Sequence, residues 1–161
     1  MFSVDYVRAQ SLDQAKAFLA SHPEAKLLAG GMTLIPTLKQ RLAQPSHLLD
    51  IAGLTELKGI ALDATTLRIG AATKHYEVAR SDVVRKAIPA LAAAADLIGD
   101  PQVRNLGTMG GSLANNDPAA DYPAAALGLG ATIVTDRRSI AADDYFQGMF
   151  QTALEDGEIV V

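Results

Sequence analysis

The hydrophobic positions of the first fifty residues alternate between short apolar runs and amphipathic stretches. Residues 26–29 and 47–51 are short apolar runs typical of buried strands. Between residues 12 and 19 the apolar positions recur at helical spacing, after Ser11 and within a capping-box pattern. A second helix is expected over residues 33–42. The pattern therefore predicts strand, helix, strand, helix, strand, which is a small α/β lobe.

The pattern changes after the first fifty residues. Residues 59–62 and 66–71 alternate around a turn and predict a β-hairpin. Residues 83–98 are rich in alanine and predict one helix, which Gly99-Asp100-Pro101 ends because the residue before a proline disfavours helical backbone. The following stretch, 102–118, is rich in Gly, Asn, Ser and Thr, and we expect it to be irregular.

The remaining residues predict one more helix and a second pair of strands. We expect a helix over 121–129 and strands over 131–135 and 139–141. Thr73 and Ser81 are expected to be helix N-caps.

The lobe boundary is expected near residues 52–56, which gives an N-terminal lobe of residues 1–54 and a second lobe of residues 55–161. The sequence ends with Glu158-Ile159-Val160-Val161, which reads as the start of a strand, so we expect this sequence to be a fragment of a longer protein.

Composition narrows the possible functions. A net charge of −4 argues against nucleic-acid binding, which needs a basic surface to displace counterions. The chain has no cysteine, which excludes disulfides, Cys-ligated zinc and iron–sulfur clusters held by this chain. We find no secretory signal and no apolar stretch long enough to span a membrane, so a soluble, cytoplasmic protein is expected.

The first glycine-rich segment lies between a predicted strand and a predicted helix. Consecutive amides at Ala29-Gly30-Gly31-Met32-Thr33 could converge on an anion, with help from the dipole of the following helix. Thr33 could supply a hydroxyl and cap that helix. The alternative is that the two glycines only make a tight turn.

The second glycine-rich segment, Gly107 to Ser112, combines glycines with hydroxyl side chains and continues into Asn115 and Asn116. Such a segment can press its backbone against a ligand and offer N–H and O–H donors. Neither segment has the spacing of a Walker phosphate loop or a Rossmann fingerprint. Two neutral, donor-rich segments better fit a diphosphate held by backbone amides, as in a dinucleotide.

Few other residues are candidates for chemistry. His22, His47 and His75 lack metal-ligand spacing, and we interpret the first two as structural or solvated. Asp117 and Asp121 could be acid/base groups or metal ligands, although helix capping, loop bracing or hydrogen bonding to ribose or ribityl hydroxyls are alternatives. Arg104 is interpreted as a brace rather than a phosphate ligand. No residue is assigned as a catalytic acid, base or nucleophile, or as a metal ligand.

Three segments together resemble a known family. Leu27–Leu34, Gly99–Ala114 and Asp117–Pro123 are similar to the medium, flavin-carrying subunit of molybdenum hydroxylases of the aerobic carbon monoxide dehydrogenase and xanthine dehydrogenase type. The resemblance follows nearly the whole chain in order. It implies an α+β, PCMH-type FAD-binding fold of two α/β lobes with the cofactor between them, and the C-terminal domain that the family carries is absent from this sequence.

The resemblance also implies which residues contact FAD. The first and second segments would contact the pyrophosphate, Asp121 would be an acidic contact, Ile98 would line the site, and Val160 would offer a backbone contact to the isoalloxazine. The implied cofactor-binding residues are Leu27, Leu28, Ala29, Gly30, Gly31, Met32, Thr33, Leu34, Ile98, Thr108, Met109, Gly110, Gly111, Ser112, Asp121 and Val160. Met32 and Ser112 stand where many relatives carry a polar residue and an asparagine.

The role that the resemblance implies is electron relay in an oxidoreductase. The partners would be a large molybdopterin-binding subunit and a small [2Fe-2S] subunit, and FAD would deliver electrons to an external acceptor. Two alternatives stay open: a fragment of a stand-alone PCMH-type flavin oxidase, and a non-catalytic module for diphosphate binding or assembly.

Overall fold

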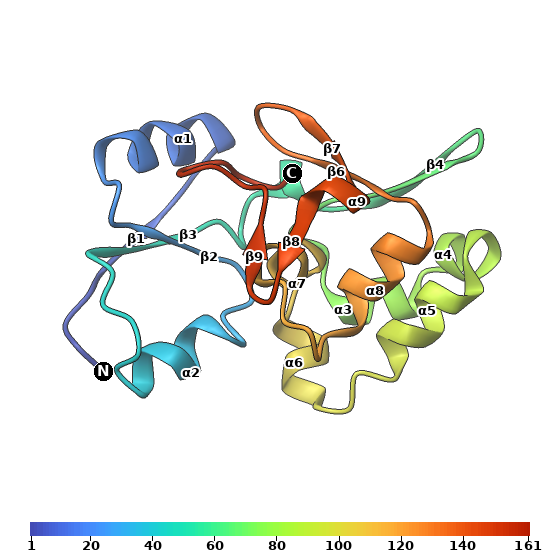
Figure 1. Ribbon diagram of the computed structural model, residues 1–161, viewed down its shortest axis with the longest axis horizontal. Helices are drawn as coiled ribbons and strands as arrows, with labels where there is room; N and C mark the ends of the chain where they lie inside the picture. Colours follow the sequence, from blue (N-terminus) through green and yellow to red (C-terminus); the bar gives the residue numbers. More distant parts are fainter.

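The computed structural model describes all 161 residues, and its N-terminal lobe is built on a parallel sheet (Figure 1). The strands are β1 (Asp5–Arg8), β2 (Lys26–Leu28) and β3 (His47–Asp50), in the order β1-β3-β2. Helices α1 (Leu12–Ser21) and α2 (Leu34–Lys39) connect them. The predicted strand, helix, strand, helix, strand order is confirmed, and Ser11 caps α1 by accepting the Gln14 amide at 3.1 Å.

The core of this first lobe takes residues from distant parts of the chain. Its buried apolar residues are Ala9, Ala15, Leu19, Ala25, Leu49, Ile51, Leu54, Leu57, Ala72 and Ile159. Leu57 belongs to the short 3-10 helix η1 (Thr55–Leu57), and Ile159 comes from the end of the sequence. The end of the chain is therefore part of the structure of the N-terminal lobe.

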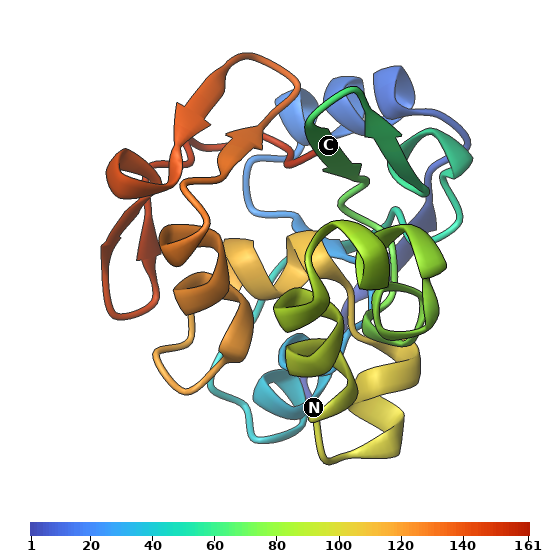
Figure 2. The same ribbon diagram turned by 90° about the vertical axis from the view of Figure 1, so that its right-hand side faces the viewer.

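The second lobe is mainly helical, with three small antiparallel hairpins at its edges (Figure 2). Its helices are α3 (His75–Arg80), α4 (Asp82–Ala87), α5 (Pro89–Asp96), α6 (Pro101–Leu106), α7 (Met109–Asn115), α8 (Asp121–Gly128) and α9 (Ala142–Tyr145). The hairpins pair β4 (Ile60–Asp63) with β5 (Thr66–Ile69), β6 (Thr132–Val134) with β7 (Ser139–Ala141), and β8 (Phe146–Gly148) with β9 (Gln151–Thr152). The expected hairpin at 59–71, the helix at 121–129 and the strands around 136–138 are confirmed.

A second buried cluster holds these helices together. It contains Val78, Ala79, Val84, Leu91, Ala92, Ala95, Met109, Leu113, Tyr122, Ile133, Ile140, Ala142 and Tyr145. Two separate cores agree with two lobes, while the division into residues 1–54 and 55–161 stays a prediction.

Three sequence-based expectations are wrong. Residues 83–98 form two helices, because Pro89 starts α5 and cannot continue the hydrogen bonding of α4. Residues 102–118 are mostly helical rather than irregular, since α6 and α7 lie there. Thr73 is not an N-cap: its hydroxyl donates to the Gly59 carbonyl at 3.2 Å, and Lys74 precedes α3 instead.

No helix in the structure combines the length and the apolar character that crossing a membrane requires.

Candidate functional site

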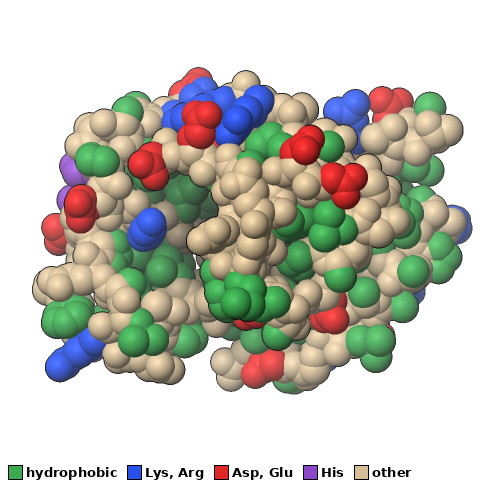
Figure 3. All heavy atoms as spheres, viewed as in Figure 1, with side chains coloured by type: hydrophobic (Ala, Val, Ile, Leu, Met, Phe, Trp, Pro, Cys, Tyr) green, Lys and Arg blue, Asp and Glu red, His purple; other side chains and the backbone are tan.

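A cleft of about 820 Å³ lies between the two lobes (Figure 3). Three walls line it: residues 25–34 of the N-terminal lobe, residues of α3 and α6–α8 of the second lobe, and the segment 154–160. We call this last segment the strap. The volume is in the range of cofactor and ligand pockets.

Almost all of the sequence-predicted site residues meet at this cleft. It is lined by Leu27, Leu28, Ala29, Gly30, Gly31, Met32, Thr33, Leu34, Ile98, Thr108, Gly110, Gly111, Ser112, Asp121 and Val160. Met109 is the exception, because its side chain is buried in the second core and its amide donates to the Thr73 carbonyl. The residues that the resemblance singled out are thus brought together from five separate stretches of sequence.

The first glycine segment presents a row of free donors. The six consecutive amides of Ala29–Leu34 donate to no backbone or side-chain acceptor of the protein, and all six residues line the cleft. Thr33 precedes α2, but its hydroxyl makes no capping hydrogen bond and is likewise free. Five of these residues are half-buried and Thr33 is exposed, so water or a ligand in the cleft can accept from these donors.

Gly30 joins the two glycine segments by close packing. A Cβ atom at this position would lie 2.2 Å from the Leu106 carbonyl oxygen and 2.7 Å from the Gly107 Cα. Gly31 has φ of +70°, a conformation that favours glycine. These glycines are therefore required by the backbone path itself. The tight-turn interpretation agrees with this geometry, and the ligand interpretation stays a prediction.

The second glycine segment is the start of helix α7, not a loop. Thr108 is its N-cap, and its hydroxyl accepts the Gly111 amide at 3.2 Å. The Met109 amide donates to Thr73 and the Gly110 amide donates to the Ala71 carbonyl at 2.8 Å. Our expectation that both segments offer free backbone amides is therefore correct for the first segment, whereas the second segment has only one amide without an acceptor in the protein, that of Thr108, because its other amides donate internally. The second segment instead offers the Ser112 hydroxyl, which has no partner in the protein, and a close backbone surface.

The charged groups around the cleft are mainly acidic. Asp117 braces its loop by accepting the Ala119 amide at 2.9 Å, whereas the exposed Asp121 accepts no hydrogen bond from the protein. Lys26 is the basic residue of the lining. Arg104 lies outside the lining and donates to the Ile98 carbonyl at 2.6 Å, so its interpretation as a brace is confirmed.

His75 and Tyr122 are cleft residues whose polar atoms are buried, and sequence reasoning gave them little weight. Their rings meet edge to face with centroids 5.0 Å apart, and neither His75 Nδ1 nor the Tyr122 hydroxyl has a hydrogen-bond partner. Burial lowers the pKa of His75 to about 4 and raises the pKa of Tyr122. Both side chains are therefore neutral at pH 7, and the cleft gains no charge from them.

His22 and His47 lie away from the cleft, on the N-terminal lobe. The His22 ring stacks on Phe18 with centroids 4.1 Å apart and meets His47 at 4.6 Å. No three His, Cys, Asp or Glu side chains are grouped so that they could hold a metal ion. The structural interpretation of both histidines agrees with this packing.

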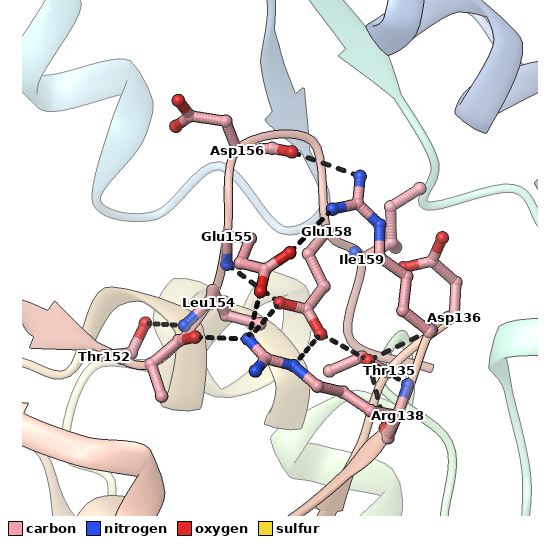
Figure 4. Close-up of polar contacts among 11 residues, drawn as sticks. Thr135, Asp136, Arg138, Thr152, Leu154, Glu155, Asp156, Glu158 and Ile159 are labelled. Carbon is pink, nitrogen blue, oxygen red and sulfur yellow. Dashed lines mark hydrogen bonds and ion pairs between the residues drawn. The ribbon is translucent and has the colours of Figure 1, made fainter.

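The strap is the wall that sequence analysis largely missed, apart from Val160. One of its residues, Glu158, has a side chain with no exposed surface and is bound by Arg138 of the second lobe (Figure 4). Arg138 and Glu158 are twenty residues apart, and no spacing rule links them. The one sequence signal was the apolar pair Ile159-Val160 after an acidic residue.

The arrangement suits a ligand with one anionic part and a large neutral part. Six free amides can hold a diphosphate without a cationic side chain, and the free carboxylate of Asp121 can accept from sugar hydroxyls. Apolar residues such as Leu28, Ile98 and Val160 line the cleft alongside these donors.

Comparison with known proteins gives a consistent result. A family model for the FAD binding domain in molybdopterin dehydrogenase matches residues 2–161. The glyceraldehyde dehydrogenase medium chain of Sulfolobus acidocaldarius is 42% identical over 96% of this chain and 57% of its own length. The carbon monoxide dehydrogenase medium chain of Hydrogenophaga pseudoflava is 43% identical over 98% of this chain and 56% of its own length.

Solved structures agree with the sequence comparison. The carbon monoxide dehydrogenase of H. pseudoflava that lacks the Mo-pyranopterin moiety of the molybdenum cofactor superposes with a TM-score of 0.95 at 41% identity. The match covers 99% of this chain and 57% of that chain. The chain thus spans a little over half the length of the relatives that it matches.

Proposed function

Because the chain belongs to the family of FAD-binding domains of molybdopterin dehydrogenases, we propose that its cleft holds FAD for electron relay in a molybdenum hydroxylase complex. Electrons would arrive from iron–sulfur clusters on another chain and leave to an external acceptor. The fold is the α+β, PCMH-type FAD-binding fold expected from the sequence, and the relatives are dehydrogenase subunits, so the protein is an oxidoreductase component.

The observation that carries the proposal is the run of free amides at Ala29–Leu34. A diphosphate placed against them would receive several N–H donors at once, and the adjoining Ser112 hydroxyl could add another. Nucleoside triphosphate enzymes usually add a lysine and a magnesium ion to such a cradle, and this cleft has neither a Walker lysine nor a metal-ligand group. The residues present fit a dinucleotide.

The other cleft residues have distinct roles in this proposal. Asp121 would accept hydrogen bonds from ribose or ribityl hydroxyls, Ile98 would pack on an apolar part of the cofactor, and Val160 would offer its backbone to the isoalloxazine. Bound FAD supplies the redox chemistry, and the protein supplies binding, orientation and electrostatics. His75 and Tyr122 keep the adjoining wall uncharged.

The partners in this proposal are a large molybdopterin-binding subunit and a small [2Fe-2S] subunit. Support comes from the relatives, which are named as medium chains of carbon monoxide and glyceraldehyde dehydrogenases. A cluster-bearing partner is also needed chemically, because this sequence has no cysteine to hold one. A stand-alone PCMH-type oxidase and a non-catalytic binding module are less favoured, since the named relatives are subunits of dehydrogenases.

Hydrogen exchange measured by mass spectrometry tests the proposal. The intact protein should carry bound flavin with its visible absorbance, and removing FAD should speed exchange of the amides at 29–34, because they have no acceptor in the protein. Peptides covering 109–112 should change much less, since those amides already donate internally. Helix α1 serves as the internal control.

Two results would contradict different parts of the proposal. Absence of flavin from the intact protein, together with no binding of added FAD, would overturn the assignment of FAD to this cleft. Bound FAD with unchanged exchange at 29–34 would overturn the diphosphate cradle alone.

A further inference from the structure

The strap crosses from one lobe to the other along the cleft. Ile159 is buried in the core of the N-terminal lobe, and Gly157 lies beside Leu19 of α1. The next residue, Val160, packs against the second core and forms a β-bridge with Thr135. The side chains of two successive residues thus enter opposite cores, as expected for extended backbone, in which successive side chains point in opposite directions. The strap therefore fixes the two lobes relative to each other.

One buried carboxylate holds the strap on the second lobe. Glu158 Oε1 accepts from the Thr135 hydroxyl at 2.7 Å and from Arg138 Nε at 3.0 Å, and Oε2 accepts from Arg138 Nη2 at 2.9 Å. The Glu155 amide adds a fourth hydrogen bond to Oε2 at 2.8 Å. Every acceptor direction of the carboxylate is thus used by the strap itself or by the β6–β7 turn (Figure 4).

Arg138 also binds the start of the strap. Its Nη2 donates to the Ala153 carbonyl at 2.7 Å, next to Leu154 where the strap begins. Beyond Glu158, the Ile159 amide donates to Asp136 Oδ1 at 2.8 Å and the Asp136 amide donates to the Ile159 carbonyl at 2.9 Å. Arg138 and its neighbours on the turn therefore hold both ends of the strap.

Because the Glu158 carboxylate is buried, its hydrogen bonds must all be kept. A carboxylate without exposed surface is stable only when paired and fully hydrogen-bonded, and removing one partner leaves an uncompensated charge. The hydrogen bonds from Arg138, the Glu155 amide and the Thr135 hydroxyl lower the pKa of Glu158 to about 2, so the ionised pair persists across the physiological pH range.

We propose that Arg138 and Glu158 are positioning residues for the flavin, because their ion pair fixes the strap that closes one side of the cofactor cleft. This inference rests on the proposed function, since it assumes FAD in the cleft. Neither residue needs to touch the cofactor. Their contribution passes through Ile159 and Val160, two residues of the strap that line the cleft.

The test compares variants of neighbouring arginines in the intact protein. Arg138→Ala should raise the dissociation constant for FAD at least tenfold and change the absorption spectrum and the midpoint potential of the bound flavin. Glu158→Gln should do the same, because its amide group would face the donors of Arg138 and Glu155. Arg137→Ala is the control for the surface contacts of the strap: Arg137 also binds the strap, through the exposed Glu155 side chain and the Asp156 carbonyl, but it does not touch Glu158, so the dissociation constant of FAD from this variant should change less than twofold.

Arg138→Lys keeps the charge but loses the two-pronged contact, so it should fall between Arg138→Ala and the wild type in affinity and spectrum. If Arg138→Ala does not fold, the affinity and spectrum of Arg138→Lys provide the test instead. A lower melting temperature with unchanged FAD affinity, spectrum and potential well below that temperature would overturn the positioning role. A wild-type protein that binds no FAD would instead overturn the proposed function on which it rests.

Discussion

Replacing Gly110 by alanine should lower the stability of the protein, whereas replacing the neighbouring Gly111 by alanine should weaken FAD binding. A Cβ atom at Gly110 would lie 2.5 Å from Ala71 Cβ and 2.9 Å from the Ala71 carbonyl oxygen. Carbon atoms prefer a separation of roughly 3.5–4.0 Å, so the overlap is about 1 Å or more. Ala71 cannot move away easily, because it is buried and its carbonyl accepts the Gly110 amide.

The expected cost follows from this overlap. Overpacking of this kind destabilises proteins by about 1–3 kcal/mol, and in a chain of this size about 2 kcal/mol lowers the melting temperature by roughly 4–8 °C. At Gly111 the added Cβ would meet only the Thr108 hydroxyl, at 2.8 Å, and that side chain can rotate away. Losing the Thr108 cap costs about 1 kcal/mol, while alanine regains about 1 kcal/mol of helix propensity, so the net change in stability is close to zero.

The effect on FAD binding should be the reverse of the effect on stability, with Gly111→Ala weakening FAD binding more than Gly110→Ala does. Gly111 is exposed at the cleft, and a methyl group there would face the cofactor, so Gly111→Ala should weaken FAD binding at nearly unchanged stability. Thermal unfolding of the flavin-free protein measures the first effect, and fluorescence titration with FAD measures the second. Equal melting temperatures for the two variants would refute the assignment of Gly110 to packing.

Two further predictions concern single side chains. Asp121→Ala should raise the dissociation constant for FAD about tenfold, as expected for losing a hydrogen bond to a charged group. Asp82→Ala, which removes another exposed first-turn aspartate far from the cleft, should leave that constant unchanged; equal effects in a titration would reject the role of Asp121. Burial of His75 should make the protein lose stability as the pH falls from 6.5 toward 4, because the unfolded chain takes up a proton that the folded protein resists. The loss is on the order of 3 kcal/mol, and His75→Leu should flatten this part of a pH series of urea unfolding curves; an unchanged slope would contradict it.

The sequence predicted the N-terminal lobe well because its signals are local. Ser11 marks the start of α1 and short apolar runs mark the strands, and each operates within a few residues. The two glycine-rich segments were found from their residue types and their place beside predicted helices and strands, whereas Ile98 and Val160 were found through the family resemblance. Free amides at 29–34 could not have been read from the residue types, since every non-proline residue carries one.

The errors arise where tertiary packing overrides local preference. Helix α7 contains Gly110 and Gly111, which are weak helix formers, yet it forms because Thr108 caps it and Met109 and Leu113 are buried on one face. The break at Pro89 was visible in the sequence and should have divided the helix predicted for 83–98. The contact between Arg138 and Glu158 depends on how the strap returns to the β6–β7 turn, and no local pattern encodes it.

The row of amides at 29–34 has a consequence for how this family can evolve. Since the donors belong to the main chain, almost any side chain that preserves the backbone path preserves them. Alanine scanning of this segment would therefore underestimate its importance, except at Gly30 and Gly31, where the path itself is at stake. Selection should therefore preserve the backbone conformation at Gly30 and Gly31, while the side chains of the neighbouring residues can vary.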